Sequence, residues 1–237
     1  MNTRFNPGTN GPLHIGHIYM ALLNQQVAHN SSGKFVLRFD DNAGHVIADY
    51  GGAGEMTNTA WRQVDDLKWM GIVPDEIVFQ SEGEEKVKKF LSQSRFQMVH
   101  SYFQEGNIPT VPTIIYGQEI SPREMCSWTI VQRVVQDRWS DIDTVIRGVD
   151  LLQNHALYMY FCALFGFRFP KCYYMPRLTT VADGDISKTI GNWSIPRLRD
   201  VGYLPEELHN ILRSSCLIDP DGAWDINNIK GQPKLFT

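Results

Sequence analysis

The sequence predicts an α/β fold in which helices pack on the faces of a parallel sheet. Short runs rich in aromatic and β-branched residues alternate with longer segments of helical periodicity along the chain. Of the 237 residues, 43% are hydrophobic and 20% are charged, which is typical of a globular protein. A chain of this length can bury a core without disulfides or metal ions. We therefore expect one large domain, or one domain that carries an insertion.

The first forty residues are predicted to form a βαβ unit. A strand is expected at 3–5, a helix at about 16–30 that ends before Gly33, and a second strand at 34–40. Proline and glycine fill the connection between the first strand and the helix. Such a unit implies two parallel strands joined by a right-handed crossover.

Strands and helices continue to alternate along the rest of the chain. The glycine-rich stretch 42–56 is predicted to be a loop. Further helices are predicted at 57–70, 84–104, 122–137 (with Ser121 as N-cap), 150–165 (capped by Asp150), 195–201 and 205–212. Further strands are predicted at 76–79, 111–115 and 144–147. In such folds, ligands bind at the carboxyl ends of the strands.

Charge and cysteine usage exclude several classes of protein. The formal net charge of -4 argues against a protein that coats nucleic acid through bulk charge, although a local basic path is compatible with it. The four cysteines form no closely spaced pair, so neither zinc nor redox chemistry is expected. The N-terminus runs into no long apolar stretch, and the most apolar segment, 151–169, is too polar to span a bilayer. We therefore expect a cytoplasmic protein without a membrane segment.

The loop after the first strand carries the strongest functional signal. Its sequence, NPGTNGPLHIGH at 6–17, combines backbone-exposing glycines with two imidazoles three residues apart, His14 and His17. At a helix start this spacing places both rings on one face, and Gly16 lets a ligand approach the backbone. The helix N-terminus adds a partial positive charge. Together these features predict an anion-binding site at the edge of the parallel sheet.

At these residues the sequence resembles a known family. TRFNPGTNGPLHIGH at 3–17, followed by KFVLRFDD, looks like the catalytic core of class I glutamyl- and glutaminyl-tRNA synthetases, whose signature is the HIGH tetrapeptide. The resemblance continues in LKWMG (67–71), VIRGVDLLQN (145–154), ISK (186–188) and VGYLPEEL (201–208). It implies a Rossmann-like catalytic domain over 1–190, interrupted by a short connective insertion at about 75–125. A short helical extension over 191–237 is expected, and no anticodon-binding domain.

The resemblance also implies a reaction, the attack of an amino-acid carboxylate on the α-phosphate of ATP. His14 and His17 would donate hydrogen bonds to the phosphates, and Lys188 would hold the leaving pyrophosphate. ATP-binding positions are implied at Gly8, Gly16, Asp150 and Ser187. Mg²⁺ would accompany ATP, with no protein ligand that the sequence identifies, and no zinc is expected.

An amino-acid pocket follows from the same resemblance. Arg4 and Arg147, at strand ends, would bind carboxylate groups, and Asp40 would pair with the substrate ammonium group. The family's tyrosine falls on Thr129, and Arg133 lies one helical turn later on the same face. Glutamate or glutamine is the default substrate, and the change at Thr129 leaves another carboxylate-bearing substrate open.

Several alternatives remain at the level of sequence. The family's first lysine of the second signature loop falls on Asp185, so this loop has lost positive charge. The acceptor of the activated acid is open between tRNA, a base within a tRNA and a non-tRNA molecule, and tRNA contacts are expected to be reduced. One alternative is a non-catalytic paralogue that binds amino acid or tRNA. Another is a nucleotidyltransferase, because those enzymes also use H-x-G-H and ISKT at 186–189 faintly resembles their second motif. The oligomeric state is not predicted.

Overall fold

The computed structural model describes residues 1–41, 53–93, 113–115, 118–120, 128–176, 178–180, 184–185, 193–213 and 234–236. Their centre is a six-stranded sheet of order β10-β7-β6-β1-β2-β3. Five of its strands pair in parallel, namely β1 (Thr3–Phe5), β2 (Phe35–Phe39), β3 (Glu76–Phe79), β6 (Thr144–Gly148) and β7 (Lys171–Met175). The predicted α/β fold on a parallel sheet is thus confirmed, with one antiparallel strand, β10 (Lys234–Phe236), added beside β7.

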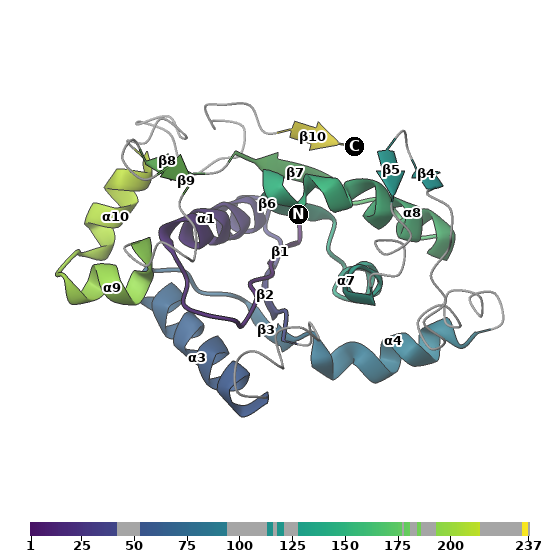
Figure 1. Ribbon diagram of the computed structural model, residues 1–237, viewed down its shortest axis with the longest axis horizontal. Helices are drawn as coiled ribbons and strands as arrows, with labels where there is room; N and C mark the ends of the chain where they lie inside the picture. The colour runs from purple at the N-terminus through teal and green to yellow at the C-terminus, as the bar shows by residue number, and fades with distance from the viewer. Residues whose placement is uncertain are drawn as a thin grey trace.

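Helices cover both faces of the sheet, as Figure 1 shows. On one side lie α1 (Ile15–Asn30), α3 (Ala53–Trp69), α9 (Ile195–Asp200) and α10 (Pro205–Leu212). On the other lie α4 (Glu84–Leu91), α7 (Trp128–Trp139) and α8 (His155–Phe165). Each side has its own apolar core, because Ile18 and Leu198 belong to one buried cluster, whereas Val131 and Phe161 belong to another. Two small antiparallel ribbons complete the described elements, β4 (Thr113–Ile115) with β5 (Gln118–Ile120), and β8 (Thr179–Thr180) with β9 (Gly184–Asp185).

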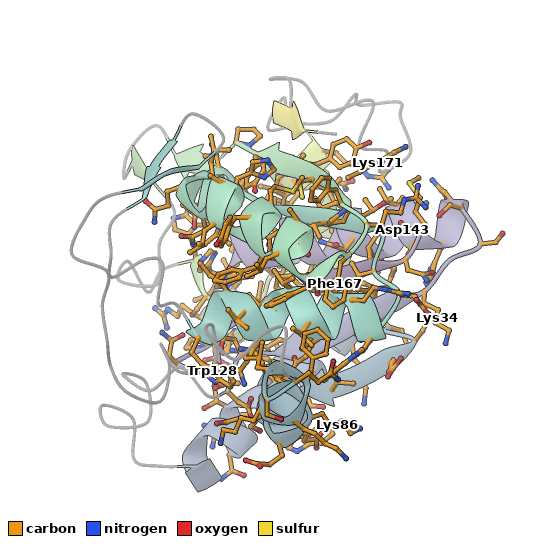
Figure 2. The ribbon with its side chains drawn as sticks, turned by 90° about the vertical axis from the view of Figure 1, so that its right-hand side faces the viewer. Lys34, Lys86, Trp128, Asp143, Phe167 and Lys171 are labelled. Carbon is orange, nitrogen blue, oxygen red and sulfur yellow. The ribbon has the colours of Figure 1, made fainter. Side chains whose placement is uncertain are left out.

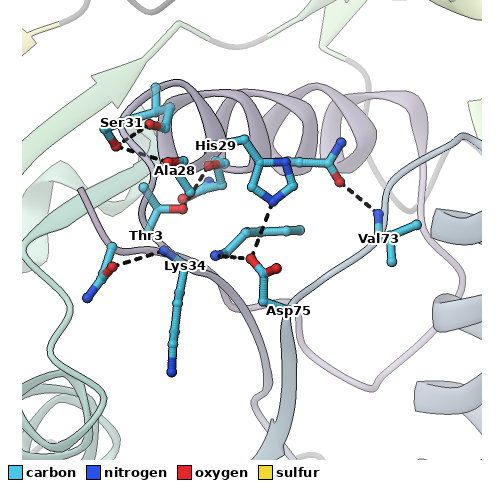
Figure 3. A network of polar contacts seen from close by, with 12 residues as sticks. Thr3, Ala28, His29, Ser31, Lys34, Val73 and Asp75 are labelled. Atoms are coloured by element: carbon cyan, nitrogen blue, oxygen red, sulfur yellow. Dashed lines mark hydrogen bonds and ion pairs between the residues drawn. The ribbon is translucent and has the colours of Figure 1, made fainter.

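Polar contacts fix the corner between α1 and the starts of the strands (Figure 3). The Asp75 carboxylate accepts a hydrogen bond from the Phe35 backbone at 2.8 Å and lies 3.3 Å from Nε2 of His29 at the end of α1. Gly33 closes the helix, and a Cβ there would lie 2.0 Å from the carbonyl oxygen of Met1. Glycine is therefore required where the chain turns from α1 into β2, just after the helix end that the sequence predicts.

The five parallel strands share a direction that places their carboxyl ends on one side of the molecule. In Figure 2, Lys34, Asp143 and Lys171 lie along one edge, which is where β2, β6 and β7 begin. Trp128, the first residue of α7, lies at the opposite edge. Strand β1 lies between β2 and β6. Strands β2 and β3 follow on one side of it, and the later strands β6 and β7 lie on its other side. This reversal of strand order at carboxyl ends is where α/β sheets bind ligands.

Several predicted helices differ from their observed bounds, three of them by four residues or more at one end. The helix predicted over 84–104 ends at Leu91, where the Ser92 hydroxyl bonds to the Lys89 carbonyl, and the residues after 93 lie outside the described part. The helix predicted from 57 already begins at Ala53, inside the predicted loop. The Asp150 prediction was wrong: residues Val149–Asn154 form a 3₁₀ segment, and α8 begins only at His155. Residues 121–127, with the predicted N-cap, are outside the described residues.

The expected division of the chain also changes. Strand β3 pairs with β2, so residues 76–79 belong to the central sheet and not to an insertion that starts at 75. The extension expected from 191 contains the helices α9 and α10, but β10 joins the sheet as well. Leu198 of α9 and Leu208 of α10 are buried in the same cluster as α1. In the part of the chain that the structure describes, no helix has both the length and the apolar character needed to cross a membrane.

Candidate active site

The start of α1 is built by its two histidines. The Nδ1 atom of His14 accepts a hydrogen bond from the backbone nitrogen of Gly16 at 3.1 Å, and Nδ1 of His17 accepts one from the backbone nitrogen of His14 at 3.2 Å. This reciprocal pattern is a capping box, in which two imidazoles satisfy backbone groups that a helix N-terminus leaves unpaired. The signature tetrapeptide is therefore a helix cap as well as a candidate catalytic group.

The capping bonds fix the protonation of both rings. A neutral imidazole carries one proton, and a ring nitrogen that accepts a hydrogen bond cannot hold it. Both Nδ1 atoms are acceptors, so the proton lies on Nε2 in each ring. The two rings stack with their centroids 3.7 Å apart. Two N–H donors are thus held side by side at the positive end of a helix, an arrangement suited to phosphate oxygens.

The two predicted glycines have local structural roles. A Cβ on Gly16 would lie 3.0 Å from Cε1 of His14, so glycine gives the imidazole room to fold back over the backbone. The sequence analysis expected Gly16 to make room for a ligand, and the structure adds this closer reason. Gly8 pairs with Asp40 through an isolated parallel bridge, and its carbonyl accepts a hydrogen bond from Gln63 at 3.0 Å.

A cavity of about 400 Å³ opens beside these residues. Ligand pockets in proteins commonly measure about 300–1,000 Å³. The cavity lies at the ends of β1 and β6 and at the start of α1. Eight predicted site residues line it, namely Arg4, Gly8, His14, Gly16, His17, Arg133, Arg147 and Asp150. Thus residues far apart in the sequence meet where the sheet topology places a ligand site.

Arg4 lines the cavity but is already paired. Its Nε and Nη2 donate to the two carboxylate oxygens of Asp137 at 2.8 and 3.0 Å, and the side chain is buried. Asp137 also accepts hydrogen bonds from Arg38 and from the Tyr158 hydroxyl. Burial alone would raise the pKa of Asp137, but Arg38 and Arg4 hold it well below its usual range. Arg4 is therefore a positioned cation, fixed from behind by a charged carboxylate.

Arg147 is held by aromatic side chains. Its guanidinium lies 4.9 Å from the ring centroid of Tyr174 and 5.3 Å from that of Tyr158, and it donates to the Tyr174 hydroxyl. That hydroxyl lies 2.9 Å from Nδ1 of His155. Burial and the charge of Arg147 lower the pKa of His155 to about 4, so this ring is neutral at pH 7. No described carboxylate pairs with Arg147, which makes it a strong candidate for binding an anion.

Asp40 differs from its expected role. The sequence analysis expected it to bind a substrate ammonium group, but its Oδ2 accepts a hydrogen bond from Nη2 of Arg133. Asp40 is buried and does not line the cavity. Thr129 lies in the first turn of α7, half-buried, and does not line the cavity either. Arg133, by contrast, lines it, one helical turn after Thr129 as expected.

The second signature loop cannot be placed in this site. Ser187 and Lys188 lie outside the described residues, so their proximity to the cavity remains a prediction. Asp150 is exposed at the cavity edge, with its carboxylate folded over Gly148. Among the described residues, no group of three or more histidine, cysteine, aspartate or glutamate side chains could hold a metal ion.

Sequence reasoning missed the residues that position the arginines. Asp137 is the most important of them, and Arg38, Tyr158, Tyr174 and His155 are the others. One signal was present: Asp137 follows Ile130 and Val134 on the apolar face of its helix. A carboxylate on a buried face must be paired, and the unmatched arginines of β1 and β2 were its available partners.

Comparison with models of known protein families identifies the family to which these residues belong. The model of the family described as "tRNA synthetases class I (E and Q), catalytic domain" matches residues 1–101 and 130–223. The chain belongs to this family. Residues 102–129, between the two segments, are not matched by the model. This class I synthetase catalytic domain therefore includes both the HIGH capping box and the arginine-lined cavity.

Curated relatives of this synthetase domain are glutamate–tRNA ligases. The mitochondrial enzyme of Saccharomyces cerevisiae is 26% identical over 286 residues, which cover 89% of this chain and 51% of the relative. The glutamate–tRNA ligase of Methanococcus maripaludis is 37% identical over 100 residues, which cover 42% of this chain and 16% of the relative. The chain thus spans about half the length, or less, of these relatives.

Solved structures share the fold. Glutamate–tRNA synthetase from Elizabethkingia anophelis matches with a TM-score of 0.70 at 18% identity, over 98% of this chain and 67% of that one. Methionyl-tRNA synthetase from Mycobacterium tuberculosis, solved with methionyl-adenylate, matches with a TM-score of 0.64 at 11% identity, over 89% of this chain and 63% of that one. At these identities the likeness establishes the class I catalytic fold of this synthetase domain.

Proposed function

We propose that this chain activates a carboxylic acid with ATP, with glutamate or glutamine as the default substrate. One observation carries the proposal: two Nε2–H donors at a helix N-terminus and three guanidinium groups line a single cavity. The former suit phosphates and the latter suit carboxylates. A site for both partners of an acyl-adenylate reaction is therefore available within one cavity of plausible size.

In the proposed step, a carboxylate oxygen of the acid attacks the α-phosphorus of ATP. A new bond forms between them, the bond from the α-phosphorus to the bridging oxygen of the β-phosphate breaks, and pyrophosphate leaves. His14 and His17 would donate hydrogen bonds to phosphate oxygens as charge develops on them. The positioning of the two reactants supplies much of the catalysis in reactions of this kind.

Other groups of the site would bind the substrates. Arg147, which has no carboxylate partner among the described residues, would hold the acid. Asp150, exposed at the cavity edge, and the backbone at Gly8 and Gly16 would contact the nucleotide. Lys188, which is outside the described residues, would hold the pyrophosphate. Mg²⁺ would accompany ATP, as the chemistry of ATP implies.

The acceptor of the activated acid is proposed to be tRNA or a group within it. The curated relatives are named glutamate–tRNA ligases, which supports this choice. The chain spans about half the length of those two relatives. A non-tRNA acceptor is the second possibility, and an assay with and without tRNA separates them.

ATP–pyrophosphate exchange tests the proposal. We expect labelled pyrophosphate to enter ATP with at least one of the standard amino acids, measured with and without total tRNA. His17→Ala and Lys188→Ala should each slow exchange by roughly ten- to a thousandfold, as expected for the loss of one transition-state donor. His29→Ala is the matched control, because His29 lies at the far end of the same helix and is exposed.

Two outcomes would contradict the proposal. Background exchange with every acid tested, both the standard amino acids and small dicarboxylic acids, with and without tRNA, would do so. If calorimetry then detected amino-acid binding, the chain would be a non-catalytic paralogue. Transfer of a nucleotide to a phosphorylated alcohol would instead favour the nucleotidyltransferase alternative.

A further inference from the structure

The carboxylate beside β2 is closed off from the cavity. Asp40 is 8% exposed, and its Oδ2 is occupied by Arg133. Its other oxygen, Oδ1, is buried and has no hydrogen-bond partner among the described residues. Arg133 lines the cavity and Asp40 does not. A ligand that enters therefore meets a guanidinium group in front of the carboxylate.

Arg133 belongs to a cluster with a surplus of positive charge. It comes from α7, whereas Arg4 comes from β1 and Arg147 from β6, and all three line the cavity. Behind them, Asp137 is shared between Arg4 and Arg38, and Asp40 pairs with Arg133. Three guanidinium groups thus share two carboxylates, and Arg147 pairs with no described carboxylate. Both Asp137 and Asp40 lie outside the cavity lining. The inner wall attracts anions and repels cations.

One carboxylate does line the cavity, but at its edge. Asp150 is exposed on the 3₁₀ segment after β6, and it is the one acidic residue among the described lining residues. Arg147, by contrast, is 7% exposed and lies between two tyrosines. A small acid bound at the arginines would place an ammonium group among cations, and Asp150 at the cavity edge is the one described lining carboxylate available to compensate its desolvation.

We propose that Arg133 is a specificity-determining residue that makes this cavity select acids with two anionic groups and no requirement for an α-ammonium group. By occupying Asp40, Arg133 replaces an ammonium-binding carboxylate with an anion-binding guanidinium. The substrate class is then a small dicarboxylic acid, of which one carboxylate is activated and the other is bound by Arg133. This inference rests on the proposed function, because it names the acid that the same cavity takes.

Calorimetry with two probes tests the inference. Glutarate has two carboxylates and no amino group, and L-glutamate has the same carbon chain with an ammonium group. We expect the wild-type protein to bind glutarate at least as tightly as L-glutamate. Arg133→Met should weaken glutarate binding by about ten- to a hundredfold, the usual effect of a lost hydrogen bond to a charged group. The affinity of this variant for L-glutamate should fall less, because the variant releases Asp40.

Arg138→Met is the matched control, since Arg138 lies on the same helix in an exposed pair with Asp141.

A second variant tests the same idea without removing Arg133. Asp40→Asn should leave glutarate binding unchanged or stronger, since it frees the Arg133 guanidinium. The inference is wrong if Asp40→Asn selectively weakens L-glutamate, or if the wild type prefers L-glutamate by more than about tenfold. It is also wrong if neither acid binds at millimolar concentration. Exchange assays with both acids separate it from the proposed function. If the protein binds glutarate in preference to L-glutamate but catalyses no exchange with either acid, only the proposed function is overturned. If exchange occurs only with L-amino acids, only the inference is overturned.

Discussion

Asp137 determines how the arginines of the cavity are held. Its carboxylate accepts hydrogen bonds from Arg4, Arg38 and Tyr158, and these residues come from β1, β2 and α8. Such a buried charge is stable only while it is paired and hydrogen-bonded. Because both arginines depend on one carboxylate, a change at this residue affects the fold and the cavity together.

Asp137→Asn should therefore destabilise the protein strongly. It leaves the Arg4 and Arg38 guanidinium groups buried without a counter-charge, for which we expect a loss of about 3–5 kcal/mol in the free energy of unfolding. Urea denaturation measures this loss. Asp141→Asn is the control: Asp141 forms an exposed pair with Arg138 at 2.9 Å, and its change should cost less than about 1 kcal/mol. Equal effects of the two substitutions would contradict the role given to Asp137.

At the scale of elements, short-range patterns were sufficient for much of the fold. The strands at 3–5 and 76–79 and the helix at 205–212 were predicted with their observed bounds, because their periodicity is local. The pairing of Arg4 with Asp137 spans 133 residues, and no local pattern encodes it. Strand β10 joins the sheet beside β7, a pairing distant in sequence that was not predicted. Eight of the residues predicted for the site line the cavity, whereas Asp40 and Thr129 do not, and no local pattern indicated that Arg133 would occupy Asp40.

Two substitutions of His14 distinguish its role as a helix cap at the start of α1 from its proposed role in the reaction. His14→Ala removes both the cap and the Nε2 donor, so it should cost about 0.5–2 kcal/mol of stability and most of the exchange activity. His14→Ser restores a capping oxygen without the donor. We expect its thermal stability to lie close to that of the wild type while exchange stays as low as in His14→Ala. If His14→Ser restored exchange, His14 would be a structural cap only.

At the scale of the whole molecule, the balance of charge is uneven. The chain has a net charge of -4, whereas the buried cluster behind the cavity carries more guanidinium than carboxylate groups. Total charge could not predict this, because it says little about one site. One acidic group elsewhere, on α3, is buried without enough positive charge beside it to keep its pKa at the ordinary value. Asp66 on α3 is buried, and burial raises its pKa to about 6.

This shift predicts how the stability of the whole fold depends on pH. Between the ordinary pKa of 3.8 and about 6, the folded protein binds a proton at Asp66 that the unfolded chain does not. The contribution of this group to stability therefore falls as the pH rises through that window. Asp66→Asn should raise the Tm at pH 7.5 by about 2–4 °C and leave it unchanged at pH 3.5. Scanning calorimetry at both values tests this, and a uniform effect at the two would contradict it.

The most direct test of the central claim is to trap the proposed intermediate. The wild-type protein is incubated with ATP labelled at the α-phosphate and with glutamate, glutamine or glutarate, then quenched in acid and separated by chromatography. We expect a labelled acyl-adenylate with at least one of these acids, and a strong loss of it in His17→Ala. Recovery of the label only as ATP, or as ADP, with every acid would contradict the account.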